Sequence, residues 1–193
     1  PVHSRPPAQL APRKTLPLLN QEDTNACTGF ALASVVHWLL KEQDATPERV
    51  SPFMLYSMAR RYDEFRGAEA DTGSSLRGAL KGWHKHGACH AKLWPALKMP
   101  KVPPDPTNDW WIDAVRRPLG AYYRIDPQMI ADLHVALDEV GILYASAVCH
   151  AGWDEGDNAK VKAPKCWEIP RRTAAASDGG HAFVIVGYDE RGF

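Results

Sequence analysis

The order of helix-like and strand-like patterns along the chain predicts an α+β protein with segregated layers. Three helix patterns with recognisable caps occupy the first half, and two apolar strand patterns flank a long polar stretch in the second half. The chain has 193 residues, and at about 150 residues per domain this length fits one domain.

The composition excludes several classes of protein. Lys plus Arg and Asp plus Glu both number 23, so no basic excess is available to bind nucleic acid. The longest mostly apolar stretch, 26–40, is too short to span a bilayer. Four cysteines without CxxC spacing indicate neither a disulfide scaffold nor a structural zinc site. We therefore expect a soluble globular protein, and the visible N-terminus shows no signal peptide.

The first half is expected to be an extended arm followed by three helices. The first twenty residues contain five prolines, which predict the arm. From 26 to 41 the apolar residues leave almost no polar face, so this stretch predicts a buried central helix. A second helix is expected at about 51–61, with Ser51 as N-cap before Pro52. A third is expected at about 74–86, with Gly87 as a left-handed C-cap.

A fourth helix follows a proline-rich stretch. Residues 94–118 contain six prolines and little periodicity, which predicts mostly loop. Asp126 and Pro127 are expected to cap the fourth helix and Gly141 to end it. Its predicted apolar stripe consists of Ile130, Leu133, Leu137 and Val140.

Two strands are expected near the end of the chain. The apolar stretch 142–148 predicts one strand, and the nearly continuous apolar run 182–188 predicts another. The polar stretch 152–180 between them is expected to be irregular.

Cys27 is the first residue whose position suggests chemistry. It starts the predicted central helix directly after Thr24 and Asn25, which can cap that helix. Unpaired backbone N–H groups and the positive end of the helix dipole favour a thiolate there. The alternative is a small buried hydrophobe, which is the usual role of a single cysteine.

His181 is the second such residue. It follows Gly179 and Gly180 and precedes the apolar strand, so two glycines that allow close approach lie beside it. A His at the start of such a strand is well placed to face a cleft. The alternative is a half-buried imidazole with its hydrogen bonds satisfied.

Together these residues resemble the active-site segments of papain-like cysteine peptidases. In 21–31, Gln21 precedes Cys27 by six residues and an aromatic–Ala pair follows, while 180–189 resembles the family's His strand. Weaker resemblances to the bacterial branch of the family lie between them and extend the match to about 18–193. They are Leu55-Tyr56, 73–77, 86–89 with Trp94-Pro95, and 122–141.

The resemblance implies a papain-like two-lobed fold. A helical lobe would pack against a mainly antiparallel β lobe, with the active-site cleft between them. We expect a single peptidase domain over 1–193, with the helical lobe at about 25–118 and the β lobe at about 1–24 and 119–193.

The resemblance also implies roles for individual residues. Cys27 would be the nucleophile and His181 the general base and acid. Gln21 would donate its side-chain amide to the oxyanion, together with the backbone N–H of Cys27. The alternative for Gln21 is a solvated polar residue in a loop.

A substrate-binding segment is implied as well. Gly73, Ser74 and Ser75 lie where the family has a segment that pairs with the substrate backbone, and Gly180 is placed with them. The alternative for the first three is the loop and N-cap of the third helix.

The chain departs from the family pattern at two places. The family's Asn, which orients the imidazole from about one strand beyond the His, has no counterpart before Phe193. Asp189 cannot replace it, because eight strand residues extend about 26 Å. We therefore expect a C-terminally incomplete domain of a longer enzyme. Many secreted members also carry a disulfide-forming Cys before the nucleophile, where this chain has 23–25.

The pairing of the three other cysteines, Cys89, Cys149 and Cys166, stays open. No metal site is predicted from the cluster near the end of the third helix, because His84 and His86 would point about 200° apart. We expect no cofactor.

The expected function is a cysteine endopeptidase that acts on peptide or protein substrates through a Cys–His dyad and a thioester acyl-enzyme. Its further partners would be other domains or a C-terminal segment of the same protein. The alternatives are a catalytically incomplete module that binds proteins and a Cys-dependent acyl or amide transferase.

Overall fold

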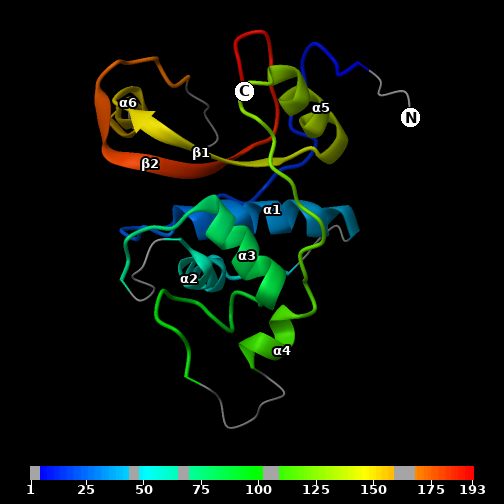
Figure 1. Ribbon diagram of the computed structural model, residues 1–193, viewed down its shortest axis with the longest axis vertical. Helices are drawn as coiled ribbons and strands as arrows, with labels where there is room; N and C mark the ends of the chain where they lie inside the picture. Colours follow the sequence, from blue (N-terminus) through cyan, green and yellow to red (C-terminus); the bar gives the residue numbers. More distant parts are fainter. Residues whose placement is uncertain (1–4, 44–47, 65–69, 102–108, 159–167) are drawn as a thin grey trace. The chain divides into compact units, whose positions relative to one another are not determined.

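The computed structural model describes residues 5–43, 48–64, 70–101, 109–158 and 168–193. The chain divides into two compact units. The larger unit comprises Pro1–Ala145 and Phe183–Phe193, and the smaller unit comprises Ser146–Ala182. Figure 1 labels the helices and strands, and the two units are described separately.

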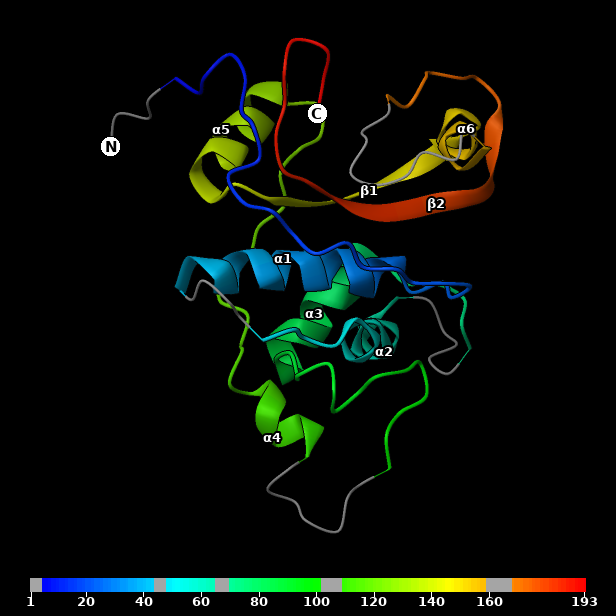
Figure 2. The same ribbon diagram turned by 180° about the vertical axis from the view of Figure 1, so that it is seen from behind.

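Three helices form the core of the larger unit. They are α1 (Cys27–Gln43), α2 (Pro52–Tyr62) and α3 (Leu76–His86), and they pack against one another in both views (Figures 1 and 2). All three agree with the predicted helices to within two residues at each end. The stretch predicted to be a buried central helix is α1, and its buried residues include Leu32, Val36 and Trp38.

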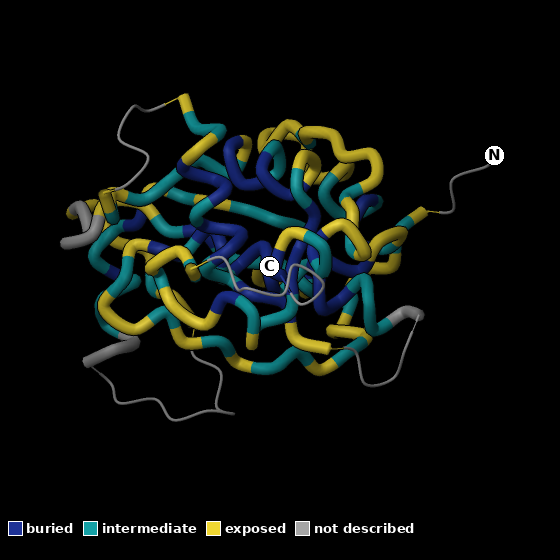
Figure 3. The backbone as a smooth tube through the Cα atoms, turned by 90° about the horizontal axis from the view of Figure 1, so that it is seen from below, coloured by how far each residue is buried: buried dark blue, intermediate teal, exposed yellow. Residues whose placement is uncertain are grey.

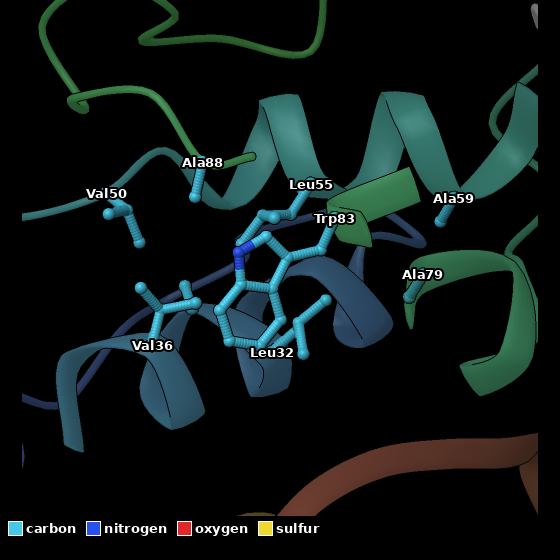
Figure 4. Packing of buried hydrophobic residues seen from close by; sticks show 9 residues of the cluster. Leu32, Val36, Val50, Leu55, Ala59, Ala79, Trp83 and Ala88 are labelled. Carbon is cyan, nitrogen blue, oxygen red and sulfur yellow. The ribbon is translucent and has the colours of Figure 1, made fainter. Parts of the chain in front are cut away.

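The indole of Trp83 fills the space between the helices. It lies among Leu32 and Val36 of α1 and Leu55 of α2 (Figure 4). Figure 3 shows how buried stretches alternate with exposed ones along the chain. Burial of such side chains contributes about 1.5–3 kcal/mol each to stability, so this cluster holds the three helices together.

Glycines let the helices approach closely. A Cβ added at Gly29 of α1 would collide with Pro52 and Tyr56 of α2. A Cβ added at Gly82 of α3 would meet Met58 of α2. Both neighbouring helices therefore pack directly against α2.

The predicted N-caps of α2 and α3 are present. Ser51 accepts a hydrogen bond from the Met54 N–H at 3.0 Å, and Ser75 accepts one from the Gly78 N–H at 3.0 Å. Gly87 has the expected positive φ of 75°, but its ψ of −160° lies outside the left-handed helical region. The turn at Gly87 leads directly to Ala88, whose N–H donates to the Ala114 carbonyl.

A short helix lies in the stretch predicted to be loop. It is α4 (Trp110–Ala114), and Asp109 caps it by accepting from the Trp110 N–H at 2.6 Å. Five residues are too few to give a helical period in the sequence. The ring of Trp110 packs against that of Trp94, with centroids 4.9 Å apart. Residues 102–108 of the predicted loop lie outside the described residues.

The predicted cap of the fourth helix is wrong. Asp126 instead starts a turn, in which its side chain accepts from the Gln128 N–H and its carbonyl from the Met129 N–H. The helix, α5, spans Ile130–Val140 and has no side-chain N-cap. Gly141 ends it as predicted, with φ 82° and ψ −6°.

The apolar stripe predicted on α5 is only partly buried. Leu137 is fully buried, whereas Ile130 is 49% exposed and Val140 39% exposed. The carbonyl of Val140 accepts from the Trp38 indole at 3.1 Å. The C-terminal part of α5 is therefore the part that contacts α1.

The two strands form a two-stranded sheet, in which β1 (Leu143–His150) pairs with β2 (Ala175–Ile185) (Figures 1 and 2). The start and end of β1 lie within two residues of the prediction. β2 begins seven residues before the predicted start at 182. The stretch 152–180 is accordingly not irregular throughout, because it contains α6 (Gly152–Asn158) and the first part of β2.

In the smaller unit, the chain after α6 is tied back to that helix. Arg172 forms two hydrogen bonds with the Glu155 carboxylate, at 2.6 and 3.0 Å. The Ala151 N–H donates to the Ala174 carbonyl at 2.9 Å. These contacts hold the start of α6 beside the residues that lead into β2.

The predicted N-terminal arm contains no helix over 5–20, and its residues 1–4 lie outside the described residues. Leu10 forms an antiparallel bridge with Tyr188, and the Tyr188 hydroxyl donates to the Pro7 carbonyl at 2.7 Å. None of the helices in the described part of the chain has the length and apolar character that a membrane crossing requires. The α+β class predicted from the sequence is confirmed.

Candidate active site

Cys27 is the first residue of α1 and is half-buried. A turn immediately before it is closed by the Thr24 hydroxyl and N–H, which both donate to the Gln21 carbonyl. The Gln21 side-chain amide in turn donates to the Thr24 carbonyl at 2.7 Å. Gln21 is thereby held in a compact turn, 21–24, that ends three residues before the helix.

Thr24 and Asn25 do not use their side chains as the predicted caps of α1. The Thr24 hydroxyl is engaged in the turn, and the Asn25 side-chain amide donates to the Asp71 carbonyl at 2.7 Å. The Asn25 backbone N–H donates to both Asp71 carboxylate oxygens, at 3.2 and 3.0 Å. The start of α1 is therefore joined to a segment 46 residues away in sequence.

That segment contains three of the residues predicted to bind substrate. The Ser74 hydroxyl lies 2.5 Å from the hydroxyl of Thr28, the residue that follows Cys27. Ser75 serves as the N-cap of α3, so the alternative interpretation holds for its side chain. Gly73 has a φ of 85°, a backbone conformation that favours glycine.

Tyr56 of α2 is hydrogen-bonded to two residues of this segment, Asp71 and Gly73. Its hydroxyl donates to the Asp71 carboxylate at 2.7 Å and accepts from the Gly73 N–H at 2.9 Å. Burial, together with the hydrogen bond to Asp71, raises the pKa of Tyr56 well above its ordinary value. The hydroxyl therefore stays protonated and remains a donor to Asp71.

Tyr144 is a neighbour of Cys27 that the sequence interpretation missed. Its hydroxyl donates to the Thr28 carbonyl at 2.8 Å. Burial raises the pKa of Tyr144 well above its ordinary value, and the electrostatic interaction with Cys27 raises it further. Nothing in the sequence distinguishes this tyrosine from other residues of the predicted strand, because the contact joins β1 to a helix 116 residues earlier.

His181 belongs to the smaller unit and lies on β2. It is half-buried, and its ring centroid lies 6.2 Å from that of Trp153 on α6, at an interplanar angle of 64°. Gly180, placed in the predicted substrate-binding set, is exposed beside it. Cys27 belongs to the larger unit.

The cluster considered for metal binding has other contacts. His86 hydrogen-bonds the Tyr62 hydroxyl at 2.8 Å, and His90 accepts from the Lys92 N–H. Burial raises the pKa of the Cys89 thiol to about 12, and the Asp113 charge adds to the shift. No group of three or more potential ligands gathers as a metal site within the described ranges.

Two solved structures resemble this chain in fold. Xylellain, a cysteine protease from Xylella fastidiosa, is 23% identical, with a TM-score of 0.72. Digestive procathepsin L 3 from the Tenebrio molitor larval midgut is 18% identical, with a TM-score of 0.68. The match covers 96% of this chain and 71% of xylellain, and 97% of this chain and 58% of the procathepsin.

No protein-family model matches the chain, and the comparison with curated proteins gives no match. At these identities the structural likeness establishes the fold alone. The papain-like fold expected from the resemblance in sequence is confirmed.

Proposed function

We propose that this chain is a papain-like cysteine peptidase domain that hydrolyses peptide bonds. The observation that carries the proposal is the environment of Cys27. The residue opens a buried helix, and the hydroxyl of the next residue of that helix, Thr28, is hydrogen-bonded to the hydroxyl of Ser74. The likeness in fold to two cysteine proteases supports the same function.

Cys27 is the proposed nucleophile. The N–H groups of the first turn of α1 would stabilise its thiolate. The thiolate would attack the substrate carbonyl carbon and form a carbon–sulfur bond. His181 would give a proton to the leaving amine as the peptide C–N bond breaks. Water would then hydrolyse the thioester, with His181 accepting its proton, and restore the thiolate.

Gln21 is the proposed oxyanion donor. A side-chain amide has two N–H donors, and one of those of Gln21 is directed to the Thr24 carbonyl. The other would bind the oxyanion together with the backbone N–H of Cys27. Loss of one such donor typically lowers kcat about 100- to 1000-fold.

The 73–75 segment is the proposed site of substrate backbone pairing. The N–H groups of Gly73 and Ser75 are occupied, by the Tyr56 hydroxyl and the Asp63 carboxylate. Among the described residues, the N–H and carbonyl of Ser74 between them have no hydrogen-bond partner. An extended peptide would satisfy both groups, as in the edge pairing of β-strands.

A labelling experiment tests the proposed function. The protein is treated with a thiol-directed peptidyl epoxide, and the labelled residue is mapped by mass spectrometry. We expect a single label on Cys27 that is lost in Cys27→Ala and retained in Cys89→Ala, whose thiol is buried.

Hydrolysis of a peptide library by the same proteins is then followed with a free amine present. Hydrolysed products that disappear in Cys27→Ala support a peptidase. Labelling that persists in Cys27→Ala would contradict the proposal, and products joined to the amine would indicate a transferase.

A further inference from the structure

The described residues just before α3 are hydrogen-bonded to residues at the start of α1. We call residues 71–75 the clamp segment. Its first residue is bound by Asn25, two residues before Cys27, and its fourth by Thr28, one residue after Cys27. The clamp segment thus lies along the residues that surround the proposed nucleophile.

Asp71 is the centre of this arrangement. Its carboxylate accepts from the Asn25 backbone N–H and from the Tyr56 hydroxyl, and its carbonyl accepts from the Asn25 side chain. Hydrogen bonds to an ionised carboxylate are about twice as strong as those between neutral groups. Asp71 is therefore the residue that joins α1, α2 and the clamp segment.

Tyr56 connects Asp71 to the proposed substrate-binding backbone. It is fully buried, and its hydroxyl links the Asp71 carboxylate to the Gly73 N–H. At the other end, the Ser75 N–H donates to the Asp63 carboxylate at 2.5 Å. The N–H groups of the residues on either side of Ser74, Gly73 and Ser75, are thereby directed into the protein.

The start of α3 does not need Asp71. Ser75 caps that helix with its own hydroxyl, and Asp63 binds the Ser75 N–H. The hydrogen bonds of Asp71 are with Asn25, two residues before α1, and with Tyr56 of α2. Its contribution is thus to the placement of the clamp segment beside Cys27 and not to the capping of α3.

We propose that Asp71, acting through Tyr56 and Asn25, is a positioning residue that presents the backbone of Ser74 to an extended peptide substrate. This inference rests on the proposed peptidase function. It extends that function by naming the side chains that hold the substrate-binding backbone in place.

Kinetics of Asp71→Asn and Tyr56→Phe test the proposal, with Asp126→Asn as the control. Asp126 is an exposed carboxylate that caps only a local turn, so its loss should leave activity unchanged. Two substrates are compared: a peptide that extends several residues before the scissile bond, so that its backbone could pair with Ser74, and an ester of a single amino acid. The rate of Cys27 alkylation by iodoacetamide is measured in parallel.

For the longer substrate we expect kcat/KM to fall about tenfold in both variants, mainly through a higher KM, because one charge-assisted hydrogen bond is lost. The ester and the alkylation rate should change less than about twofold. An unchanged kcat/KM for the longer peptide would overturn the proposal. So would an equal fall for both substrates and for alkylation, since that pattern indicates general disruption.

Amide hydrogen exchange separates this proposal from the proposed function. In Tyr56→Phe the Gly73 N–H loses its acceptor and should exchange at least about tenfold faster. If the wild-type protein cleaves no peptide, the proposed function fails. The exchange rate of the Gly73 N–H still reports whether Tyr56 holds the clamp segment. Unchanged exchange at Gly73 would then overturn the clamp itself.

Discussion

The two residues of the proposed dyad are held in different ways. Cys27 opens a 17-residue helix, and hydrogen bonds tie the residues on either side of it to the clamp segment. His181 lies on a two-stranded sheet, beside the ring of Trp153. The proposed nucleophile is thus placed by a buried helix and directed hydrogen bonds, and the proposed base by strand pairing and an aromatic neighbour.

The difference indicates where each position can be perturbed. Loss of a single hydrogen bond beside Cys27 should leave α1 and the hydrophobic residues packed against it in place. Around His181, the imidazole depends on neighbours in the smaller unit. The predictions below compare the two environments.

Substitution of His181 has the largest expected effect. In His181→Ala, kcat should fall about 100- to 10,000-fold, because the variant lacks the proposed general acid and base. The measurement is peptide hydrolysis across a range of substrate concentrations. His84→Ala, which removes an exposed histidine, is the matched control and should retain activity. A retained kcat in His181→Ala would remove His181 from the mechanism.

The helix that carries Cys27 should lose stability in acid through His37. This residue is buried on α1, where its Nε2 accepts from the Val50 N–H at 2.9 Å. Burial, with a smaller contribution from the Arg49 charge, lowers the pKa of His37 from 6.5 to about 4. Above pH 6.5 the imidazole is neutral in both states and the stability is fully present.

As the pH falls from 6.5 to about 4, only the unfolded state binds the proton, so the free energy of unfolding decreases. The expected loss over this window is about 3 kcal/mol, at up to about 1.4 kcal/mol per pH unit. Urea unfolding at several pH values measures it. His37→Gln keeps an acceptor for Val50 and should have a shallower dependence than the wild type; identical slopes would refute the assignment.

Trp153 has the smallest expected effect. Its ring lies edge-on to His181, and such ring pairs contribute about 0.5–1.5 kcal/mol. We expect Trp153→Leu to lower kcat/KM about three- to tenfold and to shift the pH profile of Cys27 alkylation, while Trp153→Phe restores most of the activity. The reference is Trp111→Leu, which changes a partly exposed indole in α4. Loss of activity without a change in the pH profile would indicate a structural role alone.

The sequence predicts the core helices well because their signals are local. Ser51, Ser75 and Gly141 act at the ends of their own helices, and the residues that define these ends lie within four positions. The predicted start of β2 is too late because its first six residues, 175–180, are small or polar and form no apolar run. Its backbone hydrogen bonds come from β1, about 30 residues earlier in the chain, so composition does not reveal them.

The candidate site divides in the same way. The segments around Cys27 and His181 are recognisable because family motifs are contiguous. Asp71, Tyr56 and Tyr144 were missed because each acts through a contact between residues 15 to 116 positions apart. Their residue types are common, and only the folded chain shows which atoms they contact.

The glycines that bring α1 and α3 against α2 limit how this protein can be diversified. A side chain at Gly29 or Gly82 would separate the helix axes, so these positions should be nearly invariant in a saturation library selected for folding. Gly120, around which a Cβ would meet nothing within 4 Å, should accept many residues. Variation that alters substrate preference should therefore accumulate in loops, and the packing of α1, α2 and α3 should be the same in all folded variants.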